Sequence, residues 1–92
     1  MKKVSEIKKV LPVWHAMTNS NQHNIRCYSI AIFFQKDIGT IFYKLFEDIM
    51  KAHLEIGQMP LWLCEIRNEI DKQMINEIAR IYGKDIAKLI ED

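Results

Sequence analysis

The sequence predicts an all-α domain, a small bundle of three or four helices around a central αα-hairpin. The first observation is that turn-forming residues are scarce. Three glycines and two prolines in 92 residues are too few for the many turns of a β-sandwich or barrel. The second is that apolar residues recur at three- and four-residue steps, which is the helical period. The third is one short connection, Gly57 to Pro60, where a glycine ends one helix and a proline suits the first turn of the next. A loop this short makes the two flanking helices antiparallel neighbours.

The N-terminal segment, residues 4–17, has the spacing of a helix. Its apolar positions are Val4, Ile7, Val10, Leu11, Trp14 and Met17. Pro12 lies among them, and because proline lacks a backbone N–H and crowds the preceding turn, we expect a kink or a restart there. The polar run TNSNQHN, residues 18–24, is typical of a loop that supplies cap residues to the next helix.

Residues 25–34, IRCYSIAIFF, admit two interpretations because their β-propensity is high. As a strand, neither face would be cleanly apolar or cleanly polar. As a helix, Cys27, Ala31 and Phe34 stay in register with later apolar positions, which are Ile38, Ile41 and Leu45. We therefore favour a helix. The alternative is an α+β fold in which residues 12–35 form an N-terminal β-hairpin that precedes two helices.

The register implies one long central helix from Asn24 to Ile56, about 33 residues and roughly 50 Å in length. This exceeds the usual helix length, so Asp37 could cap a second start and Gly39 could bend the element. Beyond the hairpin loop, a further helix up to Gly83 is predicted from its apolar positions, which are Leu63, Ile66, Ile70, Met74, Ile78 and Ile81. A short terminal helix should then fold back through its own apolar residues, Ile86, Leu89 and Ile90.

Length and composition predict one soluble, cytoplasmic domain over residues 1–92. Two cysteines, Cys27 and Cys64, are too few for a disulfide framework and suit a reducing compartment. The apolar run at residues 27–35 is far shorter than the roughly 20 residues that a bilayer span needs. We therefore expect no association with a membrane.

The residue types that bind metals or form nucleophiles are few and lack a known spacing. His23 and Cys27 stand at i,i+4, and His53 and Cys64 flank the hairpin loop, so the two pairs could in principle build one zinc site. However, the chain has no C-x-x-C or H-E-x-x-H spacing. His53 and Cys64 could also form a thiol–imidazole dyad, but no third orienting group accompanies them. We therefore predict no metal, no cofactor and no enzymatic activity.

The apolar content of the central element predicts an interaction protein. Six of the nine aromatic residues lie within residues 28–46, and a helix that is apolar on all sides must be covered on all sides. Short neighbours leave a surplus, so we expect a small accessory, adaptor or inhibitory protein that binds a protein partner and self-associates, as a homodimer. The expected partner-binding residues are Trp14, Tyr28, Phe33, Tyr43, Trp62, Arg67 and Asp71.

The charge distribution supports this prediction and also an alternative one. Net charge is +1, but residues 1–46 carry seven basic and two acidic side chains, whereas residues 47–92 carry six and ten. Such asymmetry could steer antiparallel self-association or present a basic half to an acidic partner. The alternative is a nucleic-acid-binding regulator that uses a truncated helix-turn-helix-like C-terminus or the basic N-terminal half. Its contact residues would be Lys2, Lys3, Lys8, Lys9, Arg26 and Lys36.

Overall fold

The computed structural model describes residues 1–91, and six α-helices account for most of this range. They are α1 (Val4–Ala16), α2 (Ser20–Phe33), α3 (Gln35–Ile38), α4 (Ile41–Ile56), α5 (Leu61–Tyr82) and α6 (Lys84–Glu91). No residue in the described range lies in a β-strand. The all-α prediction is therefore confirmed, and the alternative of a β-hairpin over residues 12–35 is wrong.

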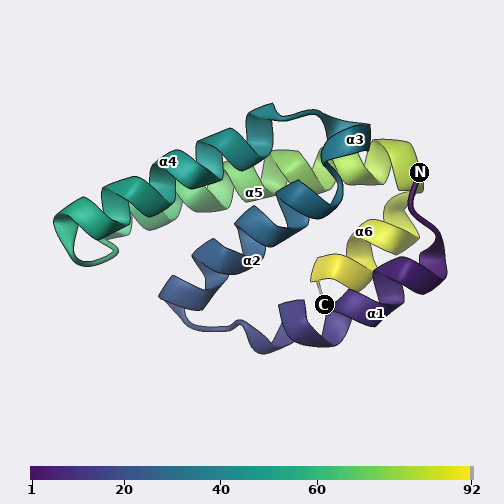
Figure 1. Ribbon diagram of the computed structural model, residues 1–92, viewed down its shortest axis with the longest axis horizontal. Helices are drawn as coiled ribbons and strands as arrows, with labels where there is room; N and C mark the ends of the chain where they lie inside the picture. The colour runs from purple at the N-terminus through teal and green to yellow at the C-terminus, as the bar shows by residue number, and fades with distance from the viewer. Residues whose placement is uncertain (92) are drawn as a thin grey trace.

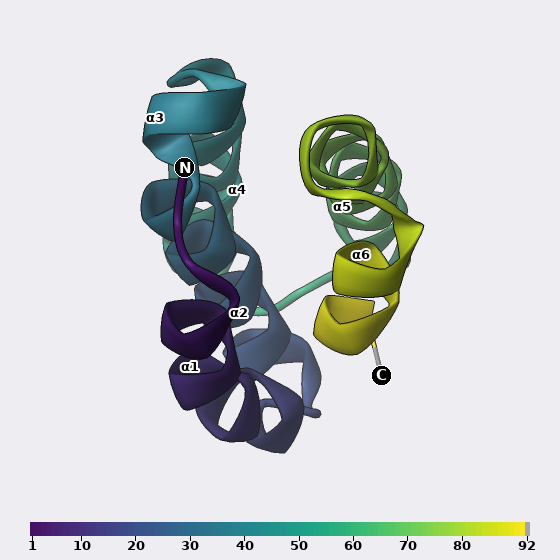
Figure 2. The same cartoon turned by 90° about the vertical axis from the view of Figure 1, so that its right-hand side faces the viewer.

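The helices form two layers, with α1 to α4 in one layer and α5 and α6 in the other (Figures 1 and 2). The molecule measures 38 × 25 × 16 Å along its principal axes. Its most deeply buried apolar side chains come from both layers and form one core, which includes Ile7, Cys27, Ile30, Ala31, Phe34, Phe46, Met74, Ile78 and Ile90. Burial of this apolar surface is what holds the two layers together.

The central element is not the continuous rod that the register implied. The α2 helix ends at Phe33, the short α3 helix follows, and Gly39 then takes a φ of 84°, in the left-handed region that favours glycine. From there α4 returns alongside α2 (Figure 1). Ile38 is still buried, but Ile41 is 58% exposed, so the apolar register ends at the glycine. Because this break divides the central element into α2, α3 and α4, the bundle has more helices than the three or four expected.

The α1 helix runs through Pro12 without the expected restart. Pro12 lies on the exposed side of the helix, where the carbonyl that loses its usual N–H partner belongs to the exposed Lys8. The following loop is shorter than predicted, because α2 already begins at Ser20. The predicted capping does occur: the Asn19 Oδ1 accepts a hydrogen bond from the Gln22 backbone N–H at 2.9 Å.

The αα-hairpin and the terminal helix agree with the prediction. Gly57 ends α4 in the left-handed conformation, with a φ of 83°, and Pro60 directly precedes α5. The α6 helix folds back and buries Ile86 and Ile90, whereas Leu89 stays at the surface. Within residues 1–91, no helix combines the length and the apolar character needed to cross a bilayer.

Candidate functional site

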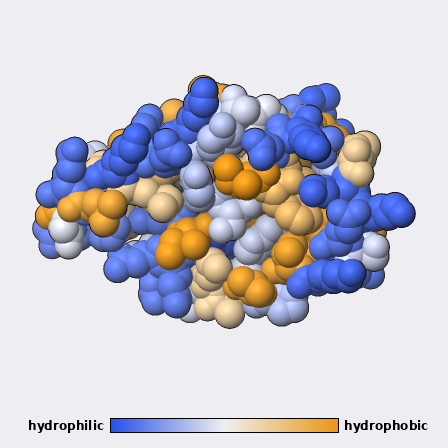
Figure 3. Space-filling model, viewed as in Figure 1, coloured by the Kyte–Doolittle hydropathy of each residue, from blue (hydrophilic) through white to orange (hydrophobic). Residues whose placement is uncertain are grey.

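An apolar groove of about 330 Å³ lies between α1 and α2. Its lining residues are Val10 and Trp14 from α1 and Tyr28, Ser29, Ile32 and Phe33 from α2. In the space-filling view, hydrophobic side chains gather over the middle of this face, where these two helices lie (Figure 3). The groove is therefore one place where apolar side chains of the central element reach solvent.

The composition of α2 explains why a groove forms here. Because Ile, Ala and Phe follow one another from residue 30 to 34, the helix is apolar in nearly every direction. Ile30, Ala31 and Phe34 face the core and are buried, but α1 covers the next face incompletely and leaves Ile32 and Phe33 half-buried. Part of the apolar surface of α2 is therefore exposed along this face, and a further part is exposed at Ile25, which is 47% exposed and lies outside the groove.

The aromatic side chains of the groove are held in fixed relative positions. The Trp14 and Phe33 rings meet edge to face with centroids 5.4 Å apart, and the Phe33 ring contacts that of Phe34 in the same way at 4.9 Å. The Lys2 ammonium lies 4.8 Å from the centroid of the Phe33 ring, within cation–π range. A ligand in the groove would therefore meet a preformed aromatic surface with a cation at its edge.

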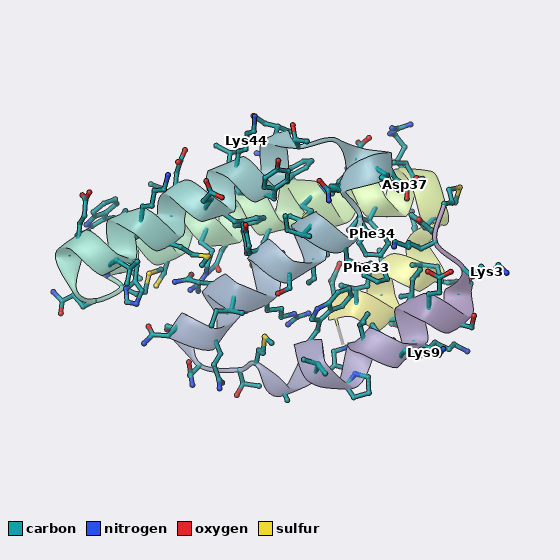
Figure 4. All side chains as sticks on the ribbon, viewed as in Figure 1. Lys3, Lys9, Phe33, Phe34, Asp37 and Lys44 are labelled. Carbon is teal, nitrogen blue, oxygen red and sulfur yellow. The ribbon has the colours of Figure 1, made fainter. Side chains whose placement is uncertain are left out.

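The helices around the groove are basic. Residues 1–36 carry six lysine and arginine side chains and one acidic side chain, Glu6. Lys3, which directly precedes α1, and Lys9 of α1 project into solvent (Figure 4), and α2 contains Arg26 as its only charged residue. This field favours a ligand with negative charge beside its apolar surface.

On another part of α2, a buried polar cluster joins this helix to α5. Arg67 of α5 and Asn24 of α2 are both buried, and the Arg67 guanidinium donates hydrogen bonds to the Asn24 Oδ1 at 3.0 Å and to the Ser20 backbone carbonyl at 2.9 Å. The Asn24 amide nitrogen in turn contacts the Met59 sulfur at 3.1 Å. A buried arginine needs such partners, because an unpaired charge in the interior is costly.

Three titratable residues adjoin this cluster. They are His23 and Cys27, one turn apart on α2, and Asp71 of α5. Burial lowers the pKa of His23 to about 4, and the nearby positive charges of Arg67 and Arg26 add to this effect. Burial and the neighbouring Asp71 carboxylate raise the pKa of the Cys27 thiol, and burial also raises the pKa of Asp71 itself. At neutral pH the imidazole and the thiol are therefore uncharged.

The structure brings some of the predicted partner-binding residues together and separates others. Trp14, Tyr28 and Phe33 share the groove, although Trp14 is only 4% exposed and so forms its floor. Tyr43 of α4 packs edge to face on Tyr28, with ring centroids 6.4 Å apart.

The other three predicted residues lie on α5. Trp62, near the start of the helix, is 54% exposed and does not line the groove. Arg67 and Asp71 belong to the polar cluster and face α2. The predicted set therefore divides among three places rather than forming one surface.

The residues predicted for nucleic-acid binding also differ in their surroundings. Lys3, Lys8, Lys9 and Lys36 are exposed, whereas Lys2 packs on Phe33. The Arg26 guanidinium donates a hydrogen bond to the Ile90 carbonyl, which draws it toward α6. Only the four exposed lysines are thus free to meet a phosphate backbone.

Several residues of these sites were not predicted. Val10 and Ile32 line the groove, and their half-buried state depends on how closely α1 approaches α2, which helical spacing does not reveal. Asn24 lies on the same buried helical face as Cys27 and Ala31, at three- and four-residue steps. This spacing could have predicted that Asn24 is buried.

His53 and Cys64 do not form the thiol–imidazole dyad that the sequence allowed, within residues 1–91. The Cys64 thiol points to the Met59 carbonyl, with 3.9 Å between sulfur and oxygen, and the buried His53 Nδ1 has no hydrogen-bond partner among the described residues. No protein-family model, no curated protein and no solved structure matches the chain.

Proposed function

We propose that this chain is a non-enzymatic protein–protein interaction protein, a small accessory, adaptor or inhibitory protein that binds an amphipathic helix in the α1–α2 groove. The observation that carries the proposal is an open groove lined by three aromatic side chains. Laying the apolar face of a helix into a hydrophobic groove is a recurrent mode of recognition between proteins. Preformed aromatic side chains are the residues that contribute most to such binding.

The charge around the groove restricts the partner to an acidic helix. Five net positive charges on residues 1–36 would attract carboxylates placed along the edge of an apolar stripe. Lys2, whose ammonium lies over the Phe33 ring, and the exposed Lys9 of α1 are suitable cations for such carboxylates.

A second copy of the chain carries such a helical face, so we propose self-association as the first instance of this binding. On α5, Trp62 and Ile66 are 54% and 46% exposed, and the exposed Glu65 and Glu69 lie on the same arc of the helix. Seating this face in the groove of a partner copy would give a two-fold dimer with two equivalent contacts. The opposite charges of the two halves of the sequence would favour this arrangement.

Analytical ultracentrifugation over a range of concentrations tests the proposal. Ile32→Glu places a carboxylate in the groove and should weaken self-association by more than about tenfold, since charge in a desolvated apolar contact is costly. Ile25→Glu is the matched control, because Ile25 lies on the same helix but outside the groove and should leave association unchanged. Trp62→Ala removes the proposed ligand face and should weaken association to a similar extent.

Mixing the two defective variants provides a sharper test. Each variant alone lacks both contacts of the two-fold dimer, whereas a mixed pair of Ile32→Glu and Trp62→Ala chains retains one intact contact. The mixture should therefore associate more strongly than either variant alone. A wild-type chain that stays monomeric would exclude the second copy as the ligand, and a protein partner that Ile32→Glu still binds with full affinity would exclude the groove itself.

The second candidate function is nucleic-acid binding, which the exposure of Lys8 and Lys9 on α1 and of Lys3 directly before it favours. Within residues 1–91, none of these three lysines forms an ion pair with an acidic side chain. This function predicts an affinity that falls steeply as salt rises. A filter-binding titration with duplex and single-stranded oligonucleotides at two salt concentrations tests it, and affinity that is absent or insensitive to salt excludes it.

A further inference from the structure

The side chains of His23, Cys27 and Asp71 form a compact three-ligand set where α2 meets α5. One nitrogen, one sulfur and one oxygen atom from these residues all lie within 4.8 Å of one another. His23 and Cys27 are one turn apart on α2, while Asp71 is more than forty positions further along the chain. We propose that these three side chains bind a thiophilic divalent cation of the zinc class.

The distances fit such an ion after small side-chain rotations. Zinc bonds to sulfur at about 2.3 Å and to nitrogen or oxygen at about 2.0–2.2 Å, so ligand atoms in a tetrahedral site lie about 3.4–3.8 Å apart. The His23 Nε2 and the Asp71 Oδ2 are already 3.9 Å apart. Both side chains are partly exposed, at 23% and 26% respectively, whereas Cys27 is fully buried. An ion would enter past the histidine and the carboxylate and meet the sulfur last.

The three donor atoms, one sulfur, one nitrogen and one oxygen, determine which metal ions the site prefers. A thiolate and an imidazole favour zinc over magnesium and calcium, which prefer sites made of oxygen atoms alone. When the ion binds, a metal–sulfur bond replaces the S–H bond of Cys27 and the proton leaves to solvent. Three protein ligands leave a fourth position for water at the exposed side.

The two nearby arginines, Arg26 and Arg67, carry positive charges that oppose a cation at this site. The Arg67 guanidinium is fixed by the Asn24 Oδ1 and the Ser20 carbonyl, and that of Arg26 is held by the Ile90 carbonyl. The Cys27 thiolate and the Asp71 carboxylate together balance the two charges of the cation. Glu91 and Lys72 line a small pocket of about 180 Å³ together with Asp71, and their opposite charges offset each other there.

A bound ion would connect the two layers of the fold. Cys27 and His23 belong to the α1–α4 layer and Asp71 to the α5–α6 layer, so the ion would stabilise the contact between them. This inference is independent of the groove, because none of the three ligands lines it.

Titration of the full chain with Co²⁺, after removal of bound metal with a chelator, tests the site. Thiolate coordination should produce a charge-transfer band in the near ultraviolet that saturates at one ion per chain, and added Zn²⁺ should remove it. Cys27→Ser should abolish the band, and His23→Gln should weaken the affinity more than about tenfold. The matched controls are Cys64→Ser and His53→Gln, which change the other cysteine and a second histidine and should leave the titration unchanged.

Each result supports or overturns the proposal. A band that survives in Cys27→Ser, or one that Cys64→Ser removes, shows that the sulfur ligand is elsewhere. Absence of a saturable band in the wild-type chain at micromolar Co²⁺ excludes the site. Because Cys27 is buried and its variant can fail to fold, the partly exposed His23→Gln is measured alongside it. Thermal unfolding of the wild-type chain with and without Zn²⁺ gives a second readout, in which an unchanged midpoint counts against the site.

Discussion

The buried pair of Asn24 and Arg67 allows a quantitative test of how the two layers are joined. In the wild-type chain each residue satisfies the other, with 3.0 Å between the Arg67 guanidinium nitrogen and the Asn24 Oδ1. Asn24→Leu removes this acceptor and leaves a buried guanidinium with one fewer partner, which should cost about 2–3 kcal/mol in the free energy of unfolding. Arg67→Met removes the charge but leaves the buried Asn24 amide short of a donor, at a cost of about 1–3 kcal/mol.

The double variant should be less destabilised than the sum of the single ones. Once both polar groups are gone, apolar side chains of similar volume fill the space and no buried charge remains unpaired. The coupling energy between the two substitutions should therefore be at least about 1.5 kcal/mol. Urea denaturation followed by circular dichroism at 222 nm gives the four free energies that this cycle needs.

Arg80→Met provides the control for this cycle, because Arg80 lies on the same helix but is exposed and, among residues 1–91, pairs only with Glu77. In the double variant with Asn24→Leu, the free-energy changes of the two substitutions should add within about 0.5 kcal/mol. If Asn24→Leu and Arg67→Met were also additive, the pair would not act as a unit and the account of the buried cluster would be wrong.

Three further predictions concern single residues, and each is checked by equilibrium unfolding of the chelator-treated chain. Phe34→Ala should cost about 3–5 kcal/mol because Phe34 is fully buried, and the half-buried Phe33→Ala should cost clearly less; equal costs would mean that Phe33 is not at the surface. Gly57→Ala should cost about 1 kcal/mol through its left-handed φ of 83° alone, since no atom lies within 4 Å of an added Cβ. The pKa of His23 is about 4 in the folded chain and 6.5 when unfolded, so the unfolded chain binds the extra proton and stability should fall by up to about 3 kcal/mol as pH decreases from 6.5 to 4. His23→Gln should remove most of this pH dependence. The remaining dependence includes Asp71, whose raised pKa makes the folded chain more stable as pH decreases, opposite to the effect of His23.

The parts of the fold that local signals specify were predictable, and the parts that depend on contact between distant helices were not. Gly57 and Pro60 mark the hairpin because a left-handed glycine and a proline act through their own backbone. Gly39 is the same kind of signal, yet the register of apolar residues across it favoured a continuous helix. That register was misleading because Phe34 and Ile38 face the same core from both sides of a break.

The candidate sites depend even more on tertiary contacts. The aromatic residues of the groove were predicted, since their types and number suggest a surface for binding. Spacing alone could not predict that Trp14 forms the floor of the groove, or that Trp62 lies outside it on another helix. Arg67 and Asp71 stood out as charges on an apolar face, but Asn24 and His23, their partners on α2, are separated from them by about forty residues. Pairings of that range become visible only when the two layers are packed together.

The amino-acid composition of α2 follows from the number of surfaces that it contacts. Ile30 and Phe34 face the core, Tyr28 and Phe33 face the groove, and His23 and Cys27 face α5. A helix used on three sides cannot keep a polar solvent face, which is why residues 25–34 resemble a strand in their content of β-branched and aromatic residues. The same partition separates the two proposals experimentally: Ile32→Glu should change association and leave Co²⁺ binding intact, and His23→Gln should do the reverse. A variant that altered both self-association and Co²⁺ binding without unfolding the chain would show that the groove and the ligand set act together.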